Sequence, residues 1–121
     1  MILFLLVTAL SAQSLDTPCK QRTDLKGACF RVRGSLRLYN GTPSARIYVT
    51  GTKRVFGVIP AITNWNETFA APPNVVSASS FDHSIEGEFL VCPLSAGRPH
   101  EMRYVCIESA TLNSKHQHGS K

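Results

Sequence analysis

Residues 29–50 read CFRVRGSLRLYNGTPSARIYVT, and this stretch decides the fold. From residue 30 to 38, apolar side chains and one glycine take the even positions, and arginine and serine take the odd positions. Such alternation is typical of a β-strand that buries one face. Asn40-Gly41, the preferred pair for a tight hairpin turn, follows it, and alternation resumes over residues 44–50. We therefore predict an antiparallel hairpin.

The hairpin has an expected register. A two-residue turn at Asn40-Gly41 pairs Leu36 with Ala45 and Gly34 with Ile47, so that the apolar residues share one face. A slip of one residue would move them all to solvent. The opposite face is then basic.

The remaining chain predicts further short strands at residues 53–59, 81–86, 88–91 and 102–108. Gly87 is predicted to break the pattern between the second and third of these strands. Residues 60–80 are rich in Pro, Asn, Ala and Ser, which indicates a long loop. Its aromatic residues Trp65 and Phe69 are candidate contact residues. We expect an all-β fold, a small antiparallel β-sandwich of six to eight strands linked by disulfides. The domain covers residues 29–112, between an N-terminal segment (13–28) and a polar tail (113–121).

Part of this pattern resembles a known family. Residues 33–36 (RGSL) and 40–49 (NGTPSARIYV) resemble the opening of transthyretin-like and carboxypeptidase-regulatory-like β-sandwiches. Residues 86–91 (EGEFLV) and 102–107 are similar to their later strands. The resemblance implies a prealbumin-like Greek key that serves as an accessory or binding module, and it carries over no catalytic residue. The chain also looks like short exported bacterial proteins of unassigned activity.

The N-terminus predicts export. Residues 2–10 (ILFLLVTAL) form an apolar run followed by small and polar residues, which is typical of a secretory signal peptide. We expect residues 1–12 to be removed and the protein to be secreted or periplasmic. The run is shorter than the ~20 residues that span a bilayer, so we expect no transmembrane span in the mature chain. Since no basic residue precedes the run, a buried N-terminal strand is the alternative.

Four cysteines, Cys19, Cys29, Cys92 and Cys106, indicate two disulfides in an exported chain. Three connectivities are open. We favour Cys92–Cys106, between neighbouring strands, with Cys19–Cys29 near the N-terminus. No pair has C-x₂-C spacing, so we predict no metal site and no cofactor.

Charge is distributed unevenly along this chain of net charge +5. Residues 20–54 carry nine basic groups and one acid, whereas residues 67–108 carry six acids and two arginines. One hypothesis is a basic strand face that binds an anionic partner. Its candidate residues are Arg31, Arg33, Arg37 and Arg46. The simpler alternative is that these arginines pair with Asp82, Glu86 and Glu88.

The leading functional hypothesis is therefore an exported, non-enzymatic binding module. Its expected partner is an extracellular or envelope polyanion or protein. Nucleic acid is not the expected partner, because the chain is predicted to be exported. The first alternative is a structural or envelope protein that self-associates through a sheet edge. The second is a small hydrolase or metal enzyme, suggested by Asp82-His83-Ser84 and by the His116/His118 pair.

We nevertheless predict no catalytic residue. Adjacent residues of a strand point to opposite faces, so Asp82, His83 and Ser84 cannot form a triad by themselves. Asn66-Glu67-Thr68 fits the acceptor pattern for N-glycosylation, and Asn66 is the candidate site.

Overall fold

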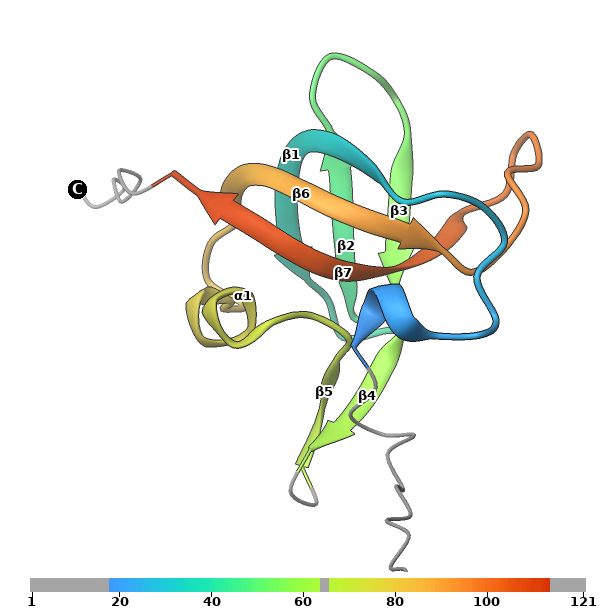
Figure 1. The fold of residues 1–121 in the computed structure, drawn as a ribbon. Helices are drawn as coiled ribbons and strands as arrows, with labels where there is room; N and C mark the ends of the chain where they lie inside the picture. The colour runs from blue at the N-terminus through green and yellow to red at the C-terminus, as the bar shows by residue number, and fades with distance from the viewer. Residues whose placement is uncertain (1–17, 64–65, 114–121) are drawn as a thin grey trace, which may run out of the picture.

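The computed structural model describes residues 18–63 and 66–113, and the predicted signal peptide, Trp65 and the tail beyond residue 113 lie outside this part of the chain (Figure 1). The elements in chain order are a 3₁₀ turn η2 (Cys19–Gln21), β1 (Phe30–Leu38), β2 (Ala45–Val49), β3 (Val55–Val58), β4 (Pro60–Thr63), β5 (Asn66–Phe69), α1 (Pro73–Ala78), β6 (Ile85–Pro93) and β7 (Arg103–Leu112). Neither described helix is long or apolar enough to cross a membrane.

Five strands close into a barrel in the order β1-β2-β3-β7-β6, and β6 pairs with β1 to complete it (Figure 1). The pairs are antiparallel except β3 with β7, which run parallel. With α1 lying between the third and fourth barrel strands in sequence, this is the connectivity of the OB fold, a five-stranded Greek-key barrel. The predicted β-rich, disulfide-linked chain is confirmed, but a closed barrel replaces the two-layer antiparallel sandwich. Alternation marks one buried face per strand, which both architectures share.

Two glycines allow barrel strands β1 and β6 to approach their neighbours closely. Gly34 of β1 and Gly87 of β6 are cross-strand partners inside the barrel. A Cβ at Gly34 would collide with the backbone oxygen of Tyr48, and one at Gly87 with that of Thr111. Strand β6 runs unbroken through Gly87, so the predicted break there is wrong. The glycine instead lets the strand curve around the core.

The β1–β2 register differs from the predicted one by two residues. Leu36 pairs with Ile47 and Leu38 with Ala45. The connection is not a two-residue turn, because the Tyr39 N–H donates to the Ser44 carbonyl oxygen (2.8 Å) and residues 39–44 form a longer loop. A shift of two preserves the side-chain alternation, so each face keeps its predicted residues.

The barrel encloses one apolar core. Its largest fully buried side chains are Leu36, Ile47, Phe56, Val58, Val75, Phe89, Val91 and Val105. Each of the five barrel strands contributes to this set, so the barrel interior is filled by side chains.

The disulfides are Cys19–Cys106 and Cys29–Cys92, so the favoured pairing was wrong. Cys92 and Cys106 are indeed cross-strand partners on β6 and β7. However, Phe30 pairs with Val91, which brings Cys29 opposite Cys92. The N-terminal segment then crosses β7, where the Lys20 N–H donates to the Glu108 carboxylate (2.7 Å), and this places Cys19 at Cys106.

Residues 60–80 are not the predicted loop. They form a two-stranded ribbon, β4–β5, and the six-residue helix α1. Pro72 and Pro73 start the helix, since proline is favoured at the first helical position. Val75 is fully buried, and the Asn74 side-chain amide donates to the Ala110 carbonyl oxygen (3.2 Å), so the helix is held against β7.

The predicted strand at residues 81–86 is also shortened. Strand β6 begins at Ile85. Phe81 is 65% exposed, and the His83 side chain is exposed as well. The chain from Ser80 to Ser84 is therefore a connection between α1 and β6.

Candidate binding surfaces

The predicted basic residues lie on the outer face of β1 and β2. Arg31, Arg33 and Arg37 are exposed, and Arg46 is half-buried. Within residues 18–63 and 66–113, Arg22–Asp24 (2.8 Å) is the one salt bridge. The arginines of this face therefore make no ion pair with a described acid.

The register divides this face into two parts. Arg33 lies opposite Glu88 on β6, and Ser35 lies opposite Glu86. Acidic groups thus flank the middle of β1, although Arg33 and Glu88 form no ion pair in the described structure. Arg37, at the far end of β1, lies instead opposite Arg46 on β2.

We call Arg37, Arg46, Tyr39 and Tyr48 the arginine–tyrosine cluster. The Arg46 guanidinium lies over the Tyr39 ring at 4.6 Å from its centroid, and that of Arg37 lies at 5.8 Å. The Arg46 Nε–H also donates to the Pro43 carbonyl oxygen (3.0 Å). Two like charges directly across a strand pair destabilise a sheet, and here the ring and the carbonyl partly offset that cost.

The two tyrosines of the cluster share a hydrogen bond between their hydroxyl groups (2.6 Å). This bond to Tyr39, followed by burial, raises the pKa of Tyr48, although Arg46 acts in the opposite direction. Near neutral pH Tyr48 is therefore a neutral phenol and does not cancel the arginine charges.

Two loops converge on this outer face at Gly57 of β3. Gly57 pairs with Arg46 on one side and with Tyr104 on the other. A Cβ at Gly57 would lie 2.7 Å from both Pro43 Cγ and Met102 Sδ, so loops 39–44 and 94–102 meet there. Sequence analysis missed Tyr39 and Tyr104, and the parallel β3–β7 pair that brings Tyr104 in has no local sequence signal.

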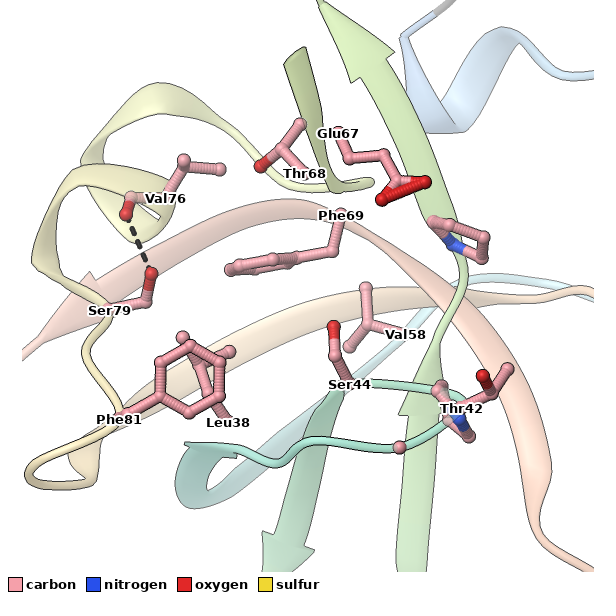
Figure 2. Close-up of a pocket in the computed structure, with 13 residues that line it drawn as sticks. Leu38, Thr42, Ser44, Val58, Glu67, Thr68, Phe69, Val76, Ser79 and Phe81 are labelled. Atoms are coloured by element: carbon pink, nitrogen blue, oxygen red, sulfur yellow. Dashed lines mark hydrogen bonds between the residues drawn. The ribbon is translucent and has the colours of Figure 1, made fainter.

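A second surface feature is a cavity of about 470 Å³ between loop 39–44, strand β5 and the chain around the end of α1 (Figure 2). The residues lining it are Leu38, Gly41, Thr42, Pro43, Ser44, Val58, Pro60, Glu67, Thr68, Phe69, Val76, Ser79 and Phe81. Figure 2 shows Phe69 between Glu67 on one side and Phe81 on the other.

Of the two predicted loop-contact residues, Trp65 and Phe69, the structure describes only Phe69. Phe69 is only 5% exposed and belongs to the core, so it is not a free loop side chain. Phe69 ends strand β5, where it pairs with Pro60 of β4, and its side chain packs into the core. Trp65 lies outside the described residues. Asn66 opens β5, and its glycosylation stays a prediction.

Among the described residues, the sulfur atoms of Cys19, Cys92 and Cys106 are the one close set of potential metal ligands, within 4.8 Å of one another. All three are in disulfides, and a metal requires the thiolate. The side chains of Asp82, His83 and Ser84 share no hydrogen bond in the described structure. His116 and His118 lie outside it.

No protein-family model, curated protein or solved structure matches this chain.

Proposed function

We propose that this protein is an exported, non-enzymatic binding module whose arginine–tyrosine cluster engages an anionic polysaccharide. The observation that carries the proposal is the cross-strand pair of Arg37 and Arg46, which no described acid neutralises. An anionic group between the two guanidinium groups would replace their repulsion with two charge-assisted hydrogen bonds. The planar guanidinium suits sulfate, phosphate and carboxylate oxygens.

The position of the cluster supports this proposal. OB folds commonly bind oligosaccharides or oligonucleotides on the face of their second and third strands and the adjoining loops. In this chain those are β2, β3 and loops 39–44 and 94–102. This is an analogy between folds, and the groups that would bind the anion in this chain are the guanidinium groups of Arg37 and Arg46.

Export supports a polysaccharide over a nucleic acid. Disulfides are typical of oxidising, extracytoplasmic compartments, and the chain has two. The apolar run at residues 2–10 has the character of a signal peptide. In such a compartment, sulfated or carboxylated cell-surface polymers are the abundant polyanions.

Charge reversal tests the proposal. We expect Arg37→Glu and Arg46→Glu each to weaken binding to heparin, used as a sulfated probe, on the order of tenfold. Lys26→Glu is the matched control, because it makes the same charge change at an exposed residue outside β1 and β2. Calorimetry at several salt concentrations measures both the affinity and its electrostatic part.

Two results would contradict the proposal. Equal losses in Lys26→Glu and Arg46→Glu would show attraction by net charge alone. Tighter binding of single-stranded DNA than of heparin at the same salt would make nucleic acid the partner class.

A further inference from the structure

The cavity of Figure 2 has the size of a small-molecule site and a lining of mixed polarity. Its volume of about 470 Å³ falls within the roughly 300–1,000 Å³ typical of such sites. Leu38 and Val58 come from the end of the barrel, and Val76 comes from α1. Three separate parts of the chain therefore supply the apolar side of a hollow that hydroxyl groups and Glu67 line elsewhere.

The cavity is chemically polarised. Glu67 is the one charged residue among those lining it, and Figure 2 shows it well separated from the apolar pair Leu38 and Phe81. No hydrogen bond or ion pair from another described residue reaches the Glu67 carboxylate. A chain of net charge +5 thus places an exposed carboxylate at the edge of a hollow that has an apolar side.

We propose that this cavity binds a small primary amine with an aliphatic or aromatic body. The ammonium group would donate to the Glu67 carboxylate, and the body would pack against the exposed Phe81. This site is separate from the arginine–tyrosine cluster and does not depend on it.

Hydroxyl groups also line the cavity, and Figure 2 shows the Ser79 hydroxyl on the far side of Phe69 from Glu67, so it would face the body of the ligand and not its ammonium group. The Ser79 hydroxyl donates to the Val76 carbonyl oxygen (2.7 Å), so its own oxygen is left to accept. Thr68, next to Glu67 on β5, and Ser44, on loop 39–44, add two further hydroxyl oxygens. Phe81, 65% exposed, gives the ligand body an apolar surface that solvent otherwise covers.

The test compares matched probes that differ only in the polar group: hexylamine, hexanol and hexanoate, with phenethylamine, phenylethanol and phenylacetate as the aromatic set. Titration followed by NMR of the Val58 and Val76 methyl groups locates binding at this cavity. We expect the amines to bind on the order of tenfold more tightly than the alcohols, with the carboxylates weakest.

Glu67→Gln keeps the shape and removes the charge, and its side chain is exposed, so folding is expected to be retained. We expect it to bring amine affinity down to that of the alcohol, while alcohol binding stays the same. Phe81→Ala should weaken amine and alcohol equally. The proposal is overturned if no probe shifts the two valines, if amine and carboxylate bind alike, or if Glu67→Gln leaves amine affinity unchanged.

Discussion

At the scale of single residues, the two facing glycines make a sharp prediction. A methyl group at Gly87 would meet the backbone of β7, which cannot move without disturbing the barrel. We expect Gly87→Ala to lower the free energy of unfolding by about 1–3 kcal/mol, as overpacking does. Denaturant unfolding measures this.

Gly97→Ala is the matched control, because a Cβ there meets Arg103 side-chain atoms only at an ordinary 3.6 Å. Equal stability of the Gly87 and Gly97 variants would show that close strand approach at Gly87 does not limit the barrel.

Tyr48 gives a prediction for high pH. Its pKa is raised above the ordinary value of about 10, chiefly by the hydrogen bond to Tyr39. The folded state therefore favours the neutral phenol. Its stabilising contribution is present in full below the ordinary pKa and is lost as pH rises through the folded one.

The ultraviolet absorbance of tyrosinate measures this titration. We expect the highest-pH transition to disappear in Tyr48→Phe. In Tyr39→Phe, the pKa of Tyr48 should fall back toward its ordinary value. A transition that survives in Tyr48→Phe would contradict the assignment.

Residue-level sequence reasoning placed the arginines on one outer face correctly, because alternation fixes sidedness. It could not say which charges meet. The pairing of Arg37 with Arg46 depends on a register that loop 39–44 sets, and the Asn40-Gly41 signal indicates a shorter turn. The pairing of Arg33 with Glu88 depends on the β1–β6 register, which joins segments far apart in the chain.

At the scale of elements, residues 60–80 show why part of the fold was missed. Strands β4 and β5 have four residues each, and α1 has six. Such short segments do not complete enough periods for alternation or helical spacing to stand out. Prolines favour a loop in the sequence pattern, although Pro72 and Pro73 start a helix here. The cavity and Glu67 escaped notice for this reason.

Loop 39–44 is the element that joins the two candidate surfaces. Its Pro43 carbonyl oxygen accepts from Arg46, and its Thr42 and Ser44 line the cavity. Changes confined to this loop should therefore affect both surfaces, whereas Glu67→Gln should leave heparin binding as it was.

At the scale of the whole molecule, the disulfides give a further prediction. Cys19–Cys106 and Cys29–Cys92 close loops with sequence separations of 87 and 63. We expect Cys19→Ala combined with Cys106→Ala to lower the free energy of unfolding by about 2–5 kcal/mol. Thermal unfolding, with and without reductant, measures the loss.

Peptide mapping without reduction checks the pairing itself. A fragment that joins Cys92 directly to Cys106 would contradict the described connectivity. The wild-type protein under reducing conditions is the control, since it should show none of the four cysteines linked.

Barrel closure could not be predicted from the sequence. The alternating pattern specified the strands and their buried faces, but the parallel pairing of β3 with β7 joins segments that are far apart in the chain. Self-association through a sheet edge stays a prediction. The five barrel strands offer no open edge, so in the described structure such association would use the β4–β5 ribbon.

The nesting of the disulfides has a consequence for proteolysis. Cys29–Cys92 lies wholly inside the interval spanned by Cys19–Cys106. A single backbone cleavage anywhere between residues 19 and 106 therefore leaves one covalent molecule. A single cut in loop 39–44 or in loop 94–102 therefore releases no fragment, because Cys19–Cys106 still joins the two pieces.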